Sequence, residues 1–187
     1  MKDVVSILES TYLKTAKQAG IEEFENKQTV ERVAQEAIDY GFKLVMVRAK
    51  YVPEIKCMIK QQNSKLLVGT VIDFPKGCSS LEDKLKIAAE AINFGADELD
   101  FVINYEAFKR GEIDVVRAEV KRCTYLCLEN QKVAKWIIEI AALRKIPVPW
   151  QILQSMDNRR RTQWRSRSTS GPVRSPGSSR AGSVFNF

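Results

Sequence analysis

The chain has 187 residues, of which 44% are hydrophobic and 28% are charged, proportions that are typical of a globular protein. No apolar run approaches the roughly 20 residues of a membrane-spanning helix, and the N-terminus lacks the features of a signal peptide, so we expect a cytoplasmic protein without a membrane partner. The absence of histidine excludes Ser-His and Cys-His nucleophile pairs and leaves Lys, Asp, Glu, Tyr and Cys for chemistry near neutral pH.

The net charge of +7 is distributed unevenly along the chain. From Arg144 to the end there are nine basic residues and one acidic residue, a net charge of +8, so the preceding 143 residues carry a net charge of −1. The basic character therefore belongs to the C-terminal segment alone.

The first 143 residues alternate between strand and helix patterns. We predict strands at residues 7–11, 43–47, 66–74, 99–104 and 133–142. We predict helices at residues 29–40, 53–62, 82–94 and 114–129, with Gly41 and Gly95 ending the first and third, Pro53 in the first turn of the second, and Ser79 or Ser80 capping the third. Strands separated by helices of this length predict βαβ units and a parallel sheet.

Several kinds of site have no support in this pattern. No glycine-rich dinucleotide or phosphate-binding motif follows any predicted strand. Cys123 and Cys127 share a helix face, but two ligands do not make a zinc site and no histidine is present to complete one. We therefore expect reduced thiols, no metal and no cofactor.

After Leu143 the alternating pattern stops. Residues 144–187 hold four of the six prolines and no amphipathic period longer than one turn. Such a composition buries too little apolar surface to offset the entropy of the chain, so we predict two parts, a folded domain over residues 1–143 and a largely disordered tail over residues 144–187.

Two charged residues stand inside apolar strands. Asp100 lies in the predicted strand 99–104 and Lys135 in the strand 133–142. An isolated buried charge is costly, and a desolvated lysine has the lowered pKa that a Schiff-base or proton-shuttling amine requires. The alternative is a structural ion pair between neighbouring strands. Weaker candidates of the same kind are Glu9, Thr11, Thr70 and Glu139.

Four ordered segments resemble the deoxyribose-phosphate aldolases. They are G-T-V-I-D-F-P-K-G (69–77), G-A-D-E-L-D-F-V-I-N (95–104), A-K-W-I-I-E (134–139) and L-E-S-T-Y-L-K (8–14), and the resemblance covers about residues 4–143. It implies a metal-free class I aldolase of (β/α)₈-barrel (TIM-barrel) fold. With five βα units in this part of the chain, we expect a curved parallel sheet of five strands, an incomplete barrel with open edges at its first and fifth strands.

The resemblance implies a function as well as a fold. The family reversibly cleaves 2-deoxyribose 5-phosphate, a small phosphorylated sugar of deoxyribonucleotide catabolism, to glyceraldehyde 3-phosphate and acetaldehyde. The family's proton-relay aspartate falls on Asp100 and its strand-five lysine on Lys135, which are the expected catalytic residues. Glu9, Thr11 and Thr70 are the expected substrate-binding residues, and a homo-oligomer is a further expectation.

The chain also departs from the family. The segment that carries the Schiff-base lysine on strand six is absent, as are the later lysine and the phosphate-binding glycines and serines. We therefore expect negligible turnover from this chain. The abrupt change after Leu143 suggests out-of-frame translation, and sequencing of the encoding DNA tests that hypothesis. The alternative function is binding of nucleic acid or an acidic surface through the arginines near Trp164, although the near-neutral domain offers no recognition motif.

Overall fold

The computed structural model describes residues 4–138 of the chain. Their strands are β1 (Glu9–Tyr12), β2 (Leu44–Val47), β3 (Leu67–Ile72), β4 (Glu98–Val102) and β5 (Val133–Ile137). Their α-helices are α1 (Ala16–Ala19), α2 (Glu23–Asp39), α3 (Val52–Gln61), α4 (Leu81–Asn93), α5 (Tyr105–Lys109) and α6 (Ile113–Glu129), and short 3₁₀ turns occupy η1 (Val4–Ile7) and η2 (Ala49–Tyr51). None of these helices is long and apolar enough to cross a membrane.

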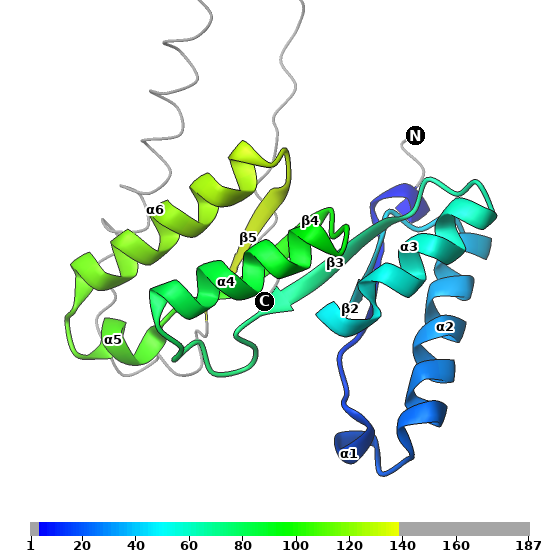
Figure 1. Cartoon of the computed structure of the whole chain (residues 1–187), viewed down its shortest axis with the longest axis horizontal. Coiled ribbons are helices and arrows are strands. Elements are labelled where there is room, and N and C mark those ends of the chain that lie inside the picture. Colours follow the sequence, from blue (N-terminus) through cyan, green and yellow to red (C-terminus); the bar gives the residue numbers. More distant parts are fainter. Residues whose placement is uncertain (1–3, 139–187) are drawn as a thin grey trace, which may run out of the picture. The chain divides into compact units, whose positions relative to one another are not determined.

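The five strands form one parallel sheet in the order β1-β2-β3-β4-β5. Each strand pairs with the next one along the chain, and at least one helix lies between every two of them, as in successive βαβ units (Figure 1). The prediction of a five-stranded parallel sheet is therefore confirmed, and it has the strand order of a barrel wall rather than of a doubly wound sheet.

The ends of several elements follow from local chemistry. Ser80 caps α4 by accepting a hydrogen bond from the Asp83 backbone N–H, and Pro53 stands in the first turn of α3, both as predicted. Gly41 follows α2 with a φ of 68°, a left-handed conformation that glycine adopts without strain.

Several elements differ from the prediction in their bounds or were not predicted. β1 begins at Glu9 rather than residue 7, because the chain before it forms the η1 turn. Helix α2 begins at Glu23, six residues before the predicted start, where Glu22 and Glu25 form a capping box over a polar first turn. Helix α5, which was not predicted, is a single short turn capped by Asn104.

The outer face of the sheet carries the main apolar core. Alternate residues of the central strands point to this face and pack against helices, among them Val45, Val68 and Leu99, all fully buried. Phe101 of β4 stacks on Trp136 of β5 with ring centroids 5.0 Å apart. Helices α4 and α6 lie side by side along this part of the sheet (Figure 1). Burial of these faces is the main stabilising contribution to the fold.

The inner face of the sheet is formed by the other residues of each strand. Leu44, Met46 and Gly69 are neighbours there, and a Cβ on Gly69 would stand 2.6 Å from Met46 Cε. Glycine at this position therefore leaves room for the methionine side chain.

The sheet is strongly curled. Strands β1 and β5 stand four positions apart, which would separate them by about 19 Å in a flat sheet. The side chains of Glu9 on β1 and Lys135 on β5 are nevertheless in contact, with Lys135 Nζ 2.9 Å from Glu9 Oε2. The inner face is therefore concave, as in a barrel wall that comprises five strands.

Candidate active site

Charged side chains gather on the concave face. Lys135 of β5 donates hydrogen bonds to both carboxylate oxygens of Glu9, at 3.1 and 2.9 Å. Its Nζ also lies 2.9 Å from Glu98 Oε2 and 3.8 Å from Asp100 Oδ1, both on β4. Lys43, just before β2, lies 3.0 Å from Glu9 and 2.8 Å from Glu98. We call these five residues the inner-face cluster.

The structure thus brings together three of the residues that the sequence singled out. Asp100 and Lys135 are register partners on neighbouring strands, and Glu9 contacts Lys135 across the concave face. Sequence reasoning missed Lys43 and Glu98. Glu98 is the first residue of β4 and only 2% exposed, but its sequence context resembles the polar turn before the strand.

Asp100 is the acid of the cluster that lies farthest from an ammonium group, 3.8 Å from Lys135 Nζ, whereas Glu9 and Glu98 each lie within 3.0 Å of both lysines. Its Oδ1 atom is buried and accepts no hydrogen bond within the described part of the chain. Burial raises the pKa of Asp100 to about 6, and the charges of Glu9 and Glu98 act in the same direction, against the opposing charges of Lys135 and Lys43. With a pKa of about 6, both the protonated and the ionised carboxyl are present near neutral pH, which a general acid or base requires.

Lys135 differs from the expectation of a lowered pKa. Burial by itself lowers the pKa of the ammonium group, but hydrogen bonds to Glu98 and Glu9 and the charge of Asp100 outweigh it, so the pKa is raised. Lys135 is therefore protonated near neutral pH and is not a nucleophile in this arrangement. Burial also lowers the pKa of Lys43, but Glu98 and Glu9 outweigh this effect, so its pKa is raised.

The two threonines proposed as substrate ligands lie on opposite faces of the sheet. Thr11 is exposed on β1, two residues beyond Glu9 and therefore on the same face of the sheet. Thr70 of β3 alternates to the outer, helix-covered face, where it is fully buried and its hydroxyl has no hydrogen-bond partner within residues 4–138. The structure therefore gives no support to a substrate contact by Thr70.

A second ionic group lies on the helix-covered side, where β3 and β4 end. The fully buried Lys84 of α4 forms an ion pair with Glu119 of α6 and donates hydrogen bonds to the carbonyls of Gly77 and Val102. Sequence reasoning missed this group because charged residues in helices usually face solvent. A signal was present, since Lys84 shares the buried stripe of α4 with Ala88 and Ala91.

Other features bear on what the site could hold. No three or more His, Cys, Asp or Glu side chains within residues 4–138 are arranged so that they could hold a metal ion. An open hollow lies just beyond the carboxyl ends of β1 and β3, lined by Leu13, Lys14, Gln18 and Phe74. This is the end of a parallel sheet at which ligands usually bind. Glu139 and the Arg-rich tail lie outside the described residues, so tail binding of nucleic acid stays a prediction from composition.

Comparison with known proteins identifies relatives of one kind. The chain is 40% identical over 116 residues to the deoxyribose-phosphate aldolase of Metamycoplasma hominis, a match that covers 62% of this chain and 52% of the relative. It is 34% identical over 144 residues to the deoxyribose-phosphate aldolase of Caldicellulosiruptor saccharolyticus, covering 76% and 60% respectively. The chain thus spans a little over half the length of these curated relatives. No family model matches it.

Solved structures agree with the sequence matches. A structure titled "QR15, an Aldolase" aligns with a TM-score of 0.61 at 30% identity and covers 74% of this chain and 57% of that one. The tetrameric deoxyribose phosphate aldolase of Aeropyrum pernix aligns with a TM-score of 0.59 at 26% identity and covers 71% and 50%. The similarity extends over about half of each of these proteins.

Proposed function

Because this chain is related in sequence and fold to the deoxyribose-phosphate aldolases over about half of their length, we propose that its inner-face cluster is part of an aldolase site for 2-deoxyribose 5-phosphate. The observation that carries the proposal is the meeting of Glu9, Asp100 and Lys135, from three different strands, on one concave face. All three stand in the segments that resemble the family.

Asp100 is the proton-transfer residue in this proposal. Cleavage of the sugar phosphate to glyceraldehyde 3-phosphate and acetaldehyde requires a group that both takes and returns a proton. A carboxyl with a pKa of about 6 is present in both forms near neutral pH, and its buried Oδ1 is free to accept a hydrogen bond from a bound molecule.

Lys135 acts through its charge rather than as the Schiff-base amine. Its ammonium group is held by Glu9 and Glu98, and it stabilises the ionised form of Asp100 from 3.8 Å. An imine forms only from a neutral amine, and the carboxylates around Lys135 oppose loss of its proton. We therefore propose that the covalent step falls to a lysine in the part of the relatives that this chain does not span.

The test is a chimera that restores the rest of an aldolase. Residues 1–138 are joined to the C-terminal half of the Metamycoplasma hominis aldolase, beginning where the match to β5 ends. We expect the chimera to cleave 2-deoxyribose 5-phosphate, and we expect Asp100→Asn to reduce kcat at least about a hundredfold, in line with loss of a general acid–base group. A folded chimera without activity, or one indifferent to Asp100→Asn, contradicts the proposal.

The 187-residue chain alone is expected to show negligible turnover. Borohydride reduction in the presence of acetaldehyde, followed by mass spectrometry, separates the two possibilities. No adduct on Lys135 is the expected result, while an adduct together with cleavage of the sugar phosphate contradicts it. Two further expectations are self-association, measured by sedimentation, and a cytoplasmic location, measured by cell fractionation.

A further inference from the structure

Lys84 is the most completely buried charged side chain in the described part of the chain. It is 0% exposed, and its partner Glu119 is 3% exposed. Four oxygen atoms surround the ammonium group. Val102 O lies at 2.8 Å, Gly77 O at 3.0 Å and Asp73 Oδ2 at 3.5 Å, and Glu119 Oε1 forms the closest contact.

These oxygens come from three separate parts of the fold. Asp73 and Gly77 belong to the loop between β3 and α4, Val102 is the last residue of β4, and Glu119 lies in the middle of α6. Lys84 itself comes from α4. One ammonium group therefore joins the ends of two neighbouring strands to the two helices that cover them, and we call these five residues the Lys84 network.

The two acids of the network also accept hydrogen bonds from the loop after β3 and from the segment after β4. Asp73 accepts hydrogen bonds from the backbone N–H and the hydroxyl of Ser79, both at 2.8 Å. Glu119 accepts one from the Asn104 N–H at 3.0 Å through its second oxygen. The two loops also touch directly, since a Cβ on Gly77 would stand 2.2 Å from the Ile103 carbonyl oxygen. Residues 73–80 thus pack closely on the segment that follows β4.

A buried ion pair contributes little net stability to a fold. The cost of removing both charges from water offsets most of their attraction, and apolar residues of similar volume often serve as well or better. An ammonium group differs from an apolar side chain in that it fixes several acceptors at defined positions. Here one of those acceptors is the carbonyl of Val102, the last residue of β4, and another is the carbonyl of Gly77 in the loop that follows β3. Ligands of parallel sheets bind at this carboxyl end of the strands.

We propose that Lys84 is a positioning residue that holds the 73–80 loop against the end of β4 and so shapes the substrate side of the site. Asp100 stands two residues before Val102 on the same strand, so the network also fixes the strand that carries it. This inference depends on the proposed function in one respect, namely that the substrate binds at the carboxyl ends of the strands.

Two variants separate positioning from stability. Lys84→Met removes the ammonium group and leaves two uncompensated acids, whereas the double variant Lys84→Met/Glu119→Gln also removes the charge of the partner. The measurement is amide hydrogen exchange by NMR in the full chain, together with its thermal unfolding. The backbone N–H groups of Gly77 and Ser79 report on the loop. The backbone N–H of Asn104 is the internal reference, because the side-chain oxygen introduced by Glu119→Gln can still accept its hydrogen bond.

We expect the double variant to recover most of the thermal stability that the single variant loses. The Gly77 and Ser79 amides should still exchange about tenfold faster or more than in the parent, because the donor that holds the loop is gone, while the Asn104 amide stays protected. Recovery of loop protection together with stability overturns the proposal, as does unchanged loop protection in both variants. If the single variant does not fold, the double variant alone decides.

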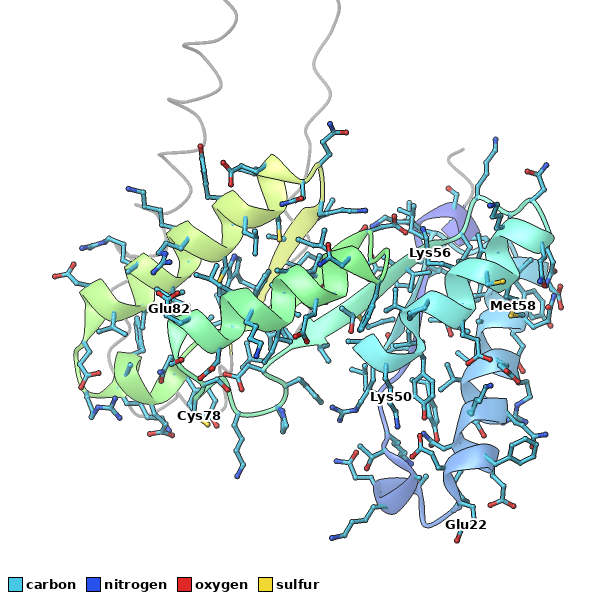
Figure 2. The ribbon with its side chains drawn as sticks, in the orientation of Figure 1. Glu22, Lys50, Lys56, Met58, Cys78 and Glu82 are labelled. Carbon is cyan, nitrogen blue, oxygen red and sulfur yellow. The ribbon has the colours of Figure 1, made fainter. Side chains whose placement is uncertain are left out.

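A matched control comes from the other end of the sheet. Lys56 of α3 pairs with Asp97 just before β4, with Nζ 2.9 Å from Oδ2. Figure 2 shows Cys78, in the 73–80 loop, beyond the carboxyl end of β3, while Lys56 lies toward the opposite end of that strand. Lys56→Met should leave exchange at Gly77 and Ser79 unchanged. These measurements use no substrate, so their outcome does not depend on the aldolase assignment. A failure of the positioning role can therefore be distinguished from a failure of that assignment.

Discussion

The inner-face cluster combines two ammonium groups with three carboxylates, whereas the Lys84 network combines one ammonium group with two carboxylates. Both therefore carry an excess of one negative charge. In the Lys84 network backbone and hydroxyl donors compensate, because Asp73 accepts two hydrogen bonds from Ser79 and Glu119 accepts one from Asn104. Oδ1 of Asp100 has no such donor among the described residues.

This contrast explains how one fold separates a fixed ionic group from a titrating one. Where N–H and O–H donors are supplied, the acids are held by defined partners and the group is structural. At Asp100, burial raises the pKa of a carboxyl whose Oδ1 has no hydrogen-bond donor among the described residues, and this group can move a proton. Four substitutions test this comparison.

Lys84→Met should have the largest effect. It leaves Glu119 and Asp73 without their cation inside the protein, so we expect the free energy of unfolding to fall by about 3–5 kcal/mol. Urea denaturation at neutral pH measures the change. The partly exposed pair of Lys56 and Asp97 provides the control, since Lys56→Met should cost about 1 kcal/mol or less. Equal losses in the two variants would show that the complete burial of Lys84 does not increase its contribution to the free energy of unfolding.

Lys135→Met should have an intermediate effect. The side chain is one-quarter exposed, and Lys43 still faces Glu9 and Glu98, so we expect a loss of about 2–3 kcal/mol in the free energy of unfolding. The pKa of Asp100 should also rise further, because its nearest positive charge is removed. Denaturation and an NMR titration of the Asp100 carboxyl measure the two quantities. A fall in the pKa of Asp100 is incompatible with the proposed arrangement.

Asp100→Asn should increase stability, and only above acidic pH. The folded-state pKa of Asp100 is about 6, above the ordinary value of 3.8, so ionisation of this group destabilises the folded state as the pH rises between these values. We expect the variant to gain about 1–3 kcal/mol over the parent near pH 8 and nothing below about pH 4. Parallel denaturation series across this range provide the measurement. A constant difference at all pH values assigns the effect to packing instead.

Lys43→Met should have the smallest effect. Its side chain is more than one-third exposed, and Lys135 continues to neutralise Glu9 and Glu98, so we expect a loss of about 1 kcal/mol or less. Thermal unfolding at low and high salt measures it, with the difference shrinking as salt rises. A loss as large as that of Lys135→Met would mean that the two lysines share the cluster equally.

The fold was largely predictable because its signals are local. Apolar runs bounded by residues such as Pro53, Ser80 and Gly41 predict β2 to β4, the start of β5 and the helices α3, α4 and α6 with small errors at the ends. The errors fall where polar sequence forms structure. Helix α2 begins in a highly charged segment stabilised by its capping box, and no apolar period marks it.

The candidate site was predictable only in part. Asp100 and Lys135 stand out because each interrupts an apolar strand, and parallel register then places them side by side. Lys43 and Glu98 precede their strands or begin them, so their sequence context resembles a solvated turn. The contacts of Lys135 with Glu9 and of Lys43 with Glu98 depend on the curl of the sheet, which is a property of several strands together and of no single segment.

The contact between Glu9 and Lys135 also bears on the order of folding. The two residues are 126 positions apart in the chain, so their pairing closes a very long loop and is expected after the local βαβ units have formed. An interaction absent from the folding transition state leaves the folding rate nearly unchanged and slows unfolding. The ion pair across the concave face therefore acts chiefly on the lifetime of the folded state, by delaying the moment at which the curled sheet opens.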